Sequence, residues 1–394
     1  MRLYGERLLL SAGDLNSFLG CRHASDLARR LLDGEAIEKG PADATLELVQ
    51  RRGLAHEAAF LRSLEAEGRQ VVEIPDGRNP EARVAATTAA MGQGAQVIFQ
   101  GALARGRWHG FADFLVRVEQ PSDLGPWCYE VVDTKLASRA KASHAVQLAL
   151  YADLVEAVQG VPPPALRVRL GTGREEVLRP ADFVHYTRLA GRRLEDFLAQ
   201  TERQTAAEPC GHCSLCDFSA RCEVEWEAAD HLSLVANIRG SQMRRLRAAG
   251  VETVAVLAAL PEVQRIPDLT PETFVKLRAQ ALLQVQARQD GRKLEVLEAS
   301  TGRGFARLPR PDPGDVFFDM EGDPLFPDGG LEYLFGAHVV GQAFLPFWAH
   351  DRAGEKRAFE EFMDWLAAQF ARHPAAHVYH YNHYEPTALK RLAM

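Results

Sequence analysis

The chain has 394 residues, 46% of them hydrophobic and 25% charged, which is the composition of an ordinary globular protein and a length that predicts two or three domains. No apolar run is long enough to cross a bilayer, and the start lacks the apolar core of a secretory signal, so a membrane protein is excluded and the cytoplasm is expected. The formal net charge of -7 argues against a uniformly basic nucleic-acid binder but allows a local basic channel.

The first expected elements are helices. Residues 11–32 have helical apolar spacing after a Ser11 or Asp14 cap, with Cys21 inside the helix. A lone cysteine on such a face is usually a small core residue. Residues 51–68 form a second amphipathic helix, which carries His56.

Two strands follow, at 110–118 and 128–137, rich in β-branched and aromatic residues. Side chains alternate along a strand, so Asp133 and Lys135 share one face. If the strands pair, Asp113 brings a second carboxylate to the same place. Two hard oxygen ligands beside a fixed cation suit Mg²⁺ or Mn²⁺ and the metal-assisted attack of water on a phosphodiester, although surface strands often carry Asp and Lys.

The next stretch reads as a helix from Ser143 to Val155, begun by a serine cap, with Gln147 and Tyr151 four residues apart on one face. A hairpin and a long helix from Ala181 to about Gln204 come after it. The hairpin segment GTGREEV, residues 171–177, lacks the lysine of a phosphate-binding loop, so ATP binding is not supported.

Four cysteines then lie within thirteen residues, at Cys210, Cys213, Cys216 and Cys222. In a cytosolic chain this clustering indicates metal rather than disulfides. A zinc ribbon would need a second separated pair, which the sequence does not have. Cys128, on the second strand, is expected to be a core residue.

Residues 232–288 have a wholly helical pattern, and Arg244 to Thr253 has the helix, glycine stop and new cap of a helix-hairpin-helix unit. From Ser233 to Arg310 there are 13 Lys and Arg against 7 Asp and Glu, whereas from Asp315 to Met394 there are 6 against 12. The basic segment is a candidate for contact with DNA phosphates, and a plain helical spacer is the alternative.

A segment rich in Gly, Arg and Pro leads to a boundary near Asp312. Beyond it the strand VFFDMEGDP places Asp319 and Glu321 on one face, and two more strands, a helix and the stretch HVYHYNHYEPTALKRL follow.

The motifs of the first part together resemble the RecB-type branch of the PD-(D/E)xK nuclease superfamily, whose G-x-x-H-E, G-x-x-D, D-x-K and Q-x-x-x-Y motifs stand here at residues 53–57, 110–113, 133–135 and 147–151. The resemblance implies that His56, Asp113 and Asp133 hold the metal and that Lys135 polarises the water or the scissile phosphate. It also implies that Gln147 and Tyr151 lie beside the nucleic-acid strand.

The cysteine pattern resembles that of RecB-like nucleases, the CRISPR-adaptation exonucleases among them, in which a four-iron, four-sulfur cluster clasps the nuclease core. The resemblance implies Cys21, Cys213, Cys216 and Cys222 as ligands. Cys210 is left over, so a zinc site that includes it stays open.

The last segment resembles the start of a ribonuclease H-like fold of the DEDD exonuclease type, with Asp319, Glu321 and Glu385 as a second metal site or as structural residues. A complete domain needs further residues, so this part is expected to be incomplete or degenerate. In proteins of this arrangement a helicase often follows.

We therefore predict an α/β chain in three parts, at residues 1–230 (restriction-endonuclease-like nuclease with cysteine clasp), 231–311 (helical linker domain) and 312–394 (incomplete ribonuclease H-like domain). The expected activity is that of a metal-dependent deoxyribonuclease, an exonuclease on single-stranded or frayed DNA, forming the front part of a nuclease-helicase in DNA repair or processing. The alternatives are a non-catalytic DNA-end-binding scaffold, a CRISPR or repair accessory subunit, and a zinc-stapled RNA-processing enzyme.

Overall fold

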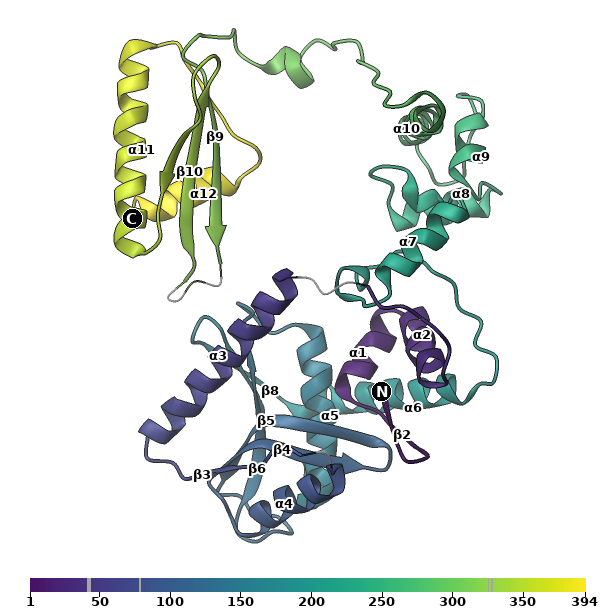
Figure 1. Ribbon diagram of the computed structural model, residues 1–394, viewed down its shortest axis with the longest axis vertical. Coiled ribbons are helices and arrows are strands. Elements are labelled where there is room, and N and C mark those ends of the chain that lie inside the picture. Colours follow the sequence, from purple (N-terminus) through teal and green to yellow (C-terminus); the bar gives the residue numbers. More distant parts are fainter. Residues whose placement is uncertain (41–43, 78, 325, 327–328) are drawn as a thin grey trace. The chain divides into compact units, whose positions relative to one another are not determined.

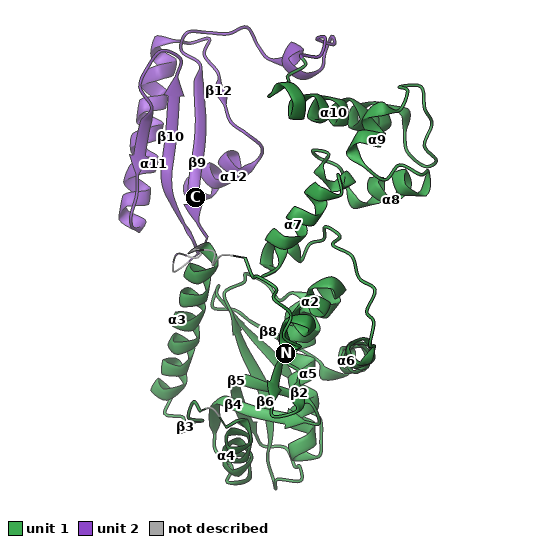
Figure 2. Ribbon diagram, turned by 45° about the vertical axis from the view of Figure 1, so that its right-hand side comes forward, with its two compact units in different colours: residues 1–295 green, residues 296–394 purple. Residues whose placement is uncertain are grey.

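The structure is a computed structural model that describes residues 1–394 except 41–43, 78, 325, 327 and 328. Two compact units, Met1–Glu295 and Val296–Met394, divide the chain (Figure 2). Within the described residues, no helix combines the length and the apolar character that a membrane span requires.

A six-stranded mixed sheet of order β3-β4-β5-β6-β7-β8 lies at the centre of the first unit. The central strand β6 is buried on both faces, whereas β7 alternates between buried and half-buried residues, as expected of a strand with one covered face. The strands are β3 (Val71–Glu73), β4 (Val97–Arg105), β5 (Trp108–Val118), β6 (Cys128–Lys135), β7 (Leu166–Leu170) and β8 (Glu175–Leu178).

Helices cover both faces of this sheet, with α3 on one side and α5 on the other (Figure 1). Helix α3 packs through Phe60 and Leu64 on the face that carries Phe114 and Val132. Helices α4 and α5 share a core with the opposite face. These helices are α3 (Ala44–Ala66), α4 (Pro80–Gly92) and α5 (Ala142–Gln159).

The N-terminal segment differs from the single helix predicted for residues 11–32. A short hairpin of β1 (Arg2–Tyr4) and β2 (Arg7–Leu9) leads into two helices, α1 (Ala12–Gly20) and α2 (Arg22–Leu32). Cys21 separates them in an extended conformation, with φ -158° and ψ 110°, and its sulfur accepts a hydrogen bond from the Ala24 N–H as the cap of α2. The prediction missed this break because apolar residues occur at helical intervals on each side of Cys21, at Leu15, Phe18 and Leu19 and again at Leu27 and Leu31.

Other boundaries shift by a few residues. Helix α5 begins at Ala142 with Lys141 as its cap, rather than at a serine cap, and the helix expected from Ala181 to Gln204 is shorter. The remaining elements as far as residue 228 are the turns η1 (Pro180–Asp182) and η2 (Cys213–Leu215) and the helices α6 (Val184–Ala199) and α7 (Ser219–Ala228).

The helical segment that follows has a hydrophobic cluster of its own, formed by residues between Leu232 and Ala281. Its predicted helix, glycine stop and new cap are confirmed: Gly250 has φ +78°, and the Thr253 side chain accepts a hydrogen bond from the Val256 N–H. The elements are η3 (Leu232–Leu234), α8 (Gly240–Ala248), α9 (Val254–Ala259) and α10 (Pro271–Asp290).

The second unit contains a four-stranded sheet of order β11-β10-β9-β12, in which only β12 runs parallel to its neighbour β9. Helix α11 covers the buried face of β9, while Phe317, Asp319 and Glu321 lie on the exposed face. The elements are η4 (Gly304–Arg307), β9 (Val316–Asp323), β10 (Leu331–Val339), β11 (Leu345–Trp348), α11 (Arg352–Arg372), β12 (Val378–Tyr379) and α12 (Tyr384–Leu392).

Candidate active site

Strands β5 and β6 bring Asp113 and Asp133 together. The strands pair antiparallel with Phe114 opposite Val132, so the same register continued by one residue sets the two aspartates opposite each other. The Asp113 Oδ2 accepts hydrogen bonds from the backbone N–H of Thr134 at 2.9 Å and from its hydroxyl at 3.1 Å. These bonds hold the Asp113 carboxylate at the end of the β5–β6 pairing, close to the carboxylate of Asp133.

Lys135 supplies a cation to the same place. Its Nζ lies 2.5 Å from the Asp133 Oδ2, and the Asp133 side chain is fully buried, whereas that of Lys135 is 25% exposed. Burial, and next the neighbouring Asp113 carboxylate, raise the pKa of Asp133 to about 7 against the opposing effect of Lys135. The site therefore holds excess negative charge that one ammonium group does not neutralise.

Helix α5 adds two polar side chains. Gln147 donates from Nε2 to the Asp133 Oδ1 at 3.1 Å. Tyr151 follows one turn later on the same helix, and burial, followed by the charges of the two aspartates, raises the Tyr151 pKa above its usual value. Three of the predicted site residues are thus joined directly, since Lys135 and Gln147 both contact Asp133. Asp113 and Tyr151 are close enough to Asp133 to interact with it electrostatically.

Gly110 makes this packing possible. A Cβ added at Gly110 would lie 2.3 Å from a ring carbon of Tyr151. We expect Gly110→Ala to lower the free energy of unfolding by about 1–3 kcal/mol through overpacking, and to displace Tyr151. Thermal melts compared with Gly53→Ala, a helical glycine with open space around it, measure the effect. Equal melting temperatures for the two variants would contradict this packing.

His56 and its neighbour Glu57 are placed differently from the two aspartates. Helix α3 packs on the sheet face that carries Phe114 and Val132, and the His56 Nε2 is 3.2 Å from the carbonyl oxygen of Arg169. Glu57 instead interacts with Asp113: burial first, and then the Asp113 charge, raise the pKa of Glu57. Glu57 is bonded to Gln100, whose φ of +55° is uncommon for a residue other than glycine.

The cysteines gather between the N-terminal helices and the segment around η2 and α7. Cys21, Cys213, Cys216 and Cys222 line one small pocket. Cys210 belongs to the same neighbourhood, since its sulfur lies 3.8 Å from that of Cys213 and it also interacts with Cys21. Burial, and to a smaller extent Glu225 and the other thiols, raise the Cys222 pKa to about 11. As predicted, Cys128 is a buried residue of β6.

The acids of the second unit are only partly brought together. Asp319 and Glu321 share the exposed face of β9, as predicted. Glu385 is buried, and its Oε2 lies 3.4 Å from the Nδ1 of His380; among the described residues no hydrogen bond or ion pair joins it to the two acids of β9.

A buried carboxylate that the sequence did not suggest, Glu332, lies on β10 opposite Gly322. It accepts hydrogen bonds from the Tyr384 hydroxyl at 2.7 Å and from Arg391 at 2.6 Å. Glu321 is close enough to Tyr384 to help raise its pKa, after burial and Glu332. The sequence signal for Glu332 was an acidic residue within the otherwise largely apolar strand β10.

Comparison with known protein families agrees with this arrangement. Residues 20–223, more than half of the chain, match the profile of the PD-(D/E)XK nuclease superfamily. The chain belongs to this superfamily. Residues 316–394 match the profile of the RNase_H superfamily. No curated protein matches the chain.

Nucleases of these two superfamilies generally use Mg²⁺ or Mn²⁺, and the carboxylates of the PD-(D/E)XK domain suit such an ion. The buried Asp133 Oδ2 has its ion pair with Lys135 but no hydrogen bond of ordinary geometry among the described residues, and the neighbouring Asp113 is a second hard oxygen donor. In the part of the chain that the structure describes, no three or more His, Cys, Asp or Glu side chains have the arrangement of a formed metal site.

Sequence reasoning missed three residues around the PD-(D/E)XK carboxylates. Glu57 stands in the quoted motif without a role, Gln100 lies across from Asp113 on β4, and Thr134, between Asp133 and Lys135, was given no role. Thr134 contributes through its backbone N–H, which donates to Asp113. A hydrogen bond from the main chain does not depend on the face that the side chain takes. Gln100 carries no signal in the sequence.

Proposed function

We propose that the chain is a metal-dependent deoxyribonuclease of the RecB type, acting as an exonuclease on single-stranded or frayed DNA. The observation that carries the proposal is the cluster of Asp113, Asp133 and Lys135 at one end of the central strands. Two carboxylates and an ammonium group at one point are the equipment for hydrolysing a phosphodiester. The basic composition of residues 233–310 adds a candidate surface for the DNA backbone.

Each residue has a distinct part in this mechanism. Asp113 and Asp133 would hold the divalent ion, with His56 or Glu57 as a further donor from α3. When bound, the ion supplies electrostatic stabilisation of the negative charge that develops during hydrolysis. Lys135 donates hydrogen bonds to the attacking water or the scissile phosphate, and Gln147 holds Asp133 in place through its 3.1 Å hydrogen bond. Tyr151 lies beside them on α5. Water adds to phosphorus as the bond to the leaving 3′-oxygen breaks.

The cysteine cluster is proposed to bind a four-iron, four-sulfur group through Cys21, Cys213, Cys216 and Cys222. Support comes from the common pocket that these four side chains line. Their thiols are raised in pKa by burial, so binding would require their deprotonation. The role proposed for the group is structural, since it would tie the N-terminal helices to α7.

The nuclease is further proposed to form the front part of a nuclease-helicase in DNA repair or processing, with the three-part division at residues 230 and 311. The second, RNase H-like site would use Asp319, Glu321 and Glu385. The separate hydrophobic cluster of the helical segment supports the first boundary. Co-purification of a helicase with the chain from its native cell is the corresponding measurement.

Digestion of end-labelled DNA tests the activity. We expect single strands and frayed duplex ends to be shortened in Mg²⁺ or Mn²⁺, and a chelator to stop the reaction. A parallel labelled RNA separates the deoxyribonuclease from an RNA-processing enzyme. DNA that stays intact after long incubation with both metals, while still bound, would favour a non-catalytic scaffold at DNA ends.

Replacing Lys135 tests the mechanism. Lys135→Ala removes the ammonium group beside Asp133, so we expect DNA cleavage to fall by about 100-fold or more, with DNA binding nearly unchanged. Lys141→Ala, at the exposed cap of α5, is the matched control because it removes the same charge six residues along. Equal loss in both variants would attribute the effect to general charge rather than to the position of Lys135.

A further inference from the structure

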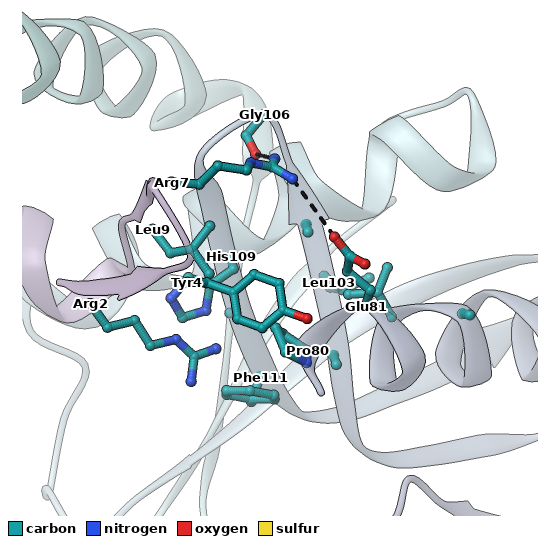
Figure 3. Close-up of a pocket in the computed structure, with 15 residues that line it drawn as sticks. Arg2, Tyr4, Arg7, Leu9, Pro80, Glu81, Leu103, Gly106, His109 and Phe111 are labelled. Carbon is teal, nitrogen blue, oxygen red and sulfur yellow. Dashed lines mark hydrogen bonds and ion pairs between the residues drawn. The ribbon is translucent and has the colours of Figure 1, made fainter. Parts of the chain in front are cut away.

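A cavity of about 280 Å³ lies between the β1–β2 hairpin, the start of α4 and the hairpin formed by β4 and β5 (Figure 3). This volume is near the lower end of small-ligand pockets, which span ~300–1,000 Å³. None of the residues described so far as metal ligands lines it, so it is distinct from the carboxylate cluster.

The cavity has an apolar floor and two aromatic rings. Leu9, Val84 and Leu103 contribute aliphatic surface. The rings of Tyr4 and Phe111 face the same space (Figure 3). Phe111 is held from another side by the Arg83 guanidinium, 4.2 Å from the ring centroid. Such a floor suits a flat, apolar group that can stack.

Cations and an unpaired nitrogen complete the lining. Arg2 is exposed and its guanidinium makes no ion pair among the described residues, while the exposed Arg7 contacts the Gly106 carbonyl at 3.3 Å and Glu81 at 3.8 Å. The Nδ1 of His109 is buried and finds no hydrogen-bond partner in the described parts of the chain. Two arginines against one glutamate leave the mouth of the cavity positive.

The cavity is coupled to the carboxylate cluster along β5. Phe111 and Asp113 are two residues apart on one strand, a strand rise of ~6.6 Å. Gly110, which lines the cavity, packs on the Tyr151 ring. The cavity and the carboxylate cluster are therefore neighbours along one strand, and both contact Tyr151 or its surroundings.

We propose that this cavity binds one base of a single-stranded nucleic acid, next to the nucleotide whose phosphate is cut. The base stacks on Tyr4 and Phe111, its polar edge meets His109 Nδ1, and its phosphate lies against Arg2 and Arg7. The identification of the ligand rests on the proposed nuclease function. Stacking on aromatic rings with cations along the backbone is how single strands are held without strict sequence preference.

A moving abasic position tests the proposal. The probe is a fluorescent single strand of thymidine nucleotides, intact or lacking one base, with binding followed by anisotropy in a chelator. For the unmodified protein, we expect one abasic position to weaken binding by about tenfold. Tyr4→Ala should weaken binding of the intact strand by a similar factor and should remove the penalty at that position. Tyr4→Phe, which keeps the ring, should restore both.

Leu3→Ala is the matched control, because Leu3 is exposed on the same strand and does not line the cavity. It should keep the abasic penalty. Arg2→Ala should weaken binding of every strand equally and reduce the salt dependence by about one ion. Thermal melts check that the variants are folded.

An abasic penalty that persists in Tyr4→Ala, or is absent from the unmodified protein, would overturn the cavity assignment even if DNA is cut normally. The opposite result separates the two proposals: if the penalty appears and depends on Tyr4 but no strand is cut in Mg²⁺ or Mn²⁺, the cavity stands as a binding site and the nuclease function fails.

Discussion

Replacing Asp133 with asparagine is expected to abolish DNA cleavage while leaving the fold intact. The variant keeps the volume of the side chain and the hydrogen bond with Gln147 but removes the charge that would hold the ion. Loss of several kcal/mol of charge stabilisation corresponds to a fall in rate of about a thousandfold or more. Single-turnover digestion of an end-labelled strand in Mn²⁺ measures it.

The same variant should be more stable than the unmodified protein when metal is removed. Asp133 has a folded-state pKa of about 7 against 3.8 for the free group, so the folded protein binds more protons than the unfolded chain between these values. The stability of the unmodified protein therefore falls as pH rises from about 4 to 7, and Asp133→Asn removes this part of the fall. Urea unfolding in a chelator at pH 5 and pH 8 measures the difference.

Glu130→Gln is a suitable control, since Glu130 is another buried acid of β6 but pairs with Arg167 at 2.6 Å, away from the cluster. It should keep cleavage and lose some stability, because Arg167 would lose the buried one of its two carboxylate partners and keep only Glu175. Cleavage by Asp133→Asn at the unmodified rate, or an Asp133→Asn protein less stable than the unmodified one at pH 8 without metal, would contradict the assignment of Asp133.

The sequence was sufficient for the part of the site that depends on one strand pair. Alternation along β6 places Asp133 and Lys135 on one face whatever the rest of the fold does, and an antiparallel partner strand then needs only the observed register to add Asp113. Gln147 and Tyr151 followed from helical spacing. Both inferences use periodicity within one element, which sequence records directly.

Contacts between elements were harder to predict. The spacing in residues 51–68 does not decide which side chain of α3 reaches the carboxylates. His56 and Glu57 lie four and three residues before Phe60, so both flank the face that packs on the sheet. The structure bonds His56 to the Arg169 carbonyl and sets Glu57 beside Asp113. The role of His56 as a ligand stays a prediction, and metal titration of His56→Ala against Glu57→Ala would decide between them.

The break at Cys21 shows a second limit. Apolar residues occur at helical intervals both before and after Cys21, so the pattern does not mark the one residue whose backbone is extended. The Cys21 sulfur has two roles: it caps α2, and it interacts with the thiols of Cys210 and Cys213. Only the second, which depends on residues far along the chain, explains why a cysteine rather than a serine should stand there.

Cys21→Ser therefore separates the helix-capping role of Cys21 from its role among the cysteines. Serine is among the best helix caps, so the hydrogen bond to Ala24 should survive and the local helix should lose nothing. If Cys21 is an iron ligand, the anaerobically purified variant should lose the brown colour and the absorption at roughly 400 nm that thiolate–iron bonds give. It should also unfold at a lower temperature than the unmodified protein, because cluster binding is linked to folding.

Cys210→Ser is the decisive comparison, because Cys210 is exposed and yet its sulfur lies 3.8 Å from the sulfur of Cys213. The proposed ligand set predicts that this variant keeps its iron, its colour and its melting temperature. Loss of iron in Cys210→Ser but not in Cys21→Ser would move the site to the four cysteines between residues 210 and 222. A colourless unmodified protein that contains zinc would replace the cluster with a zinc staple, and the same pair of variants would then identify its ligands by metal content.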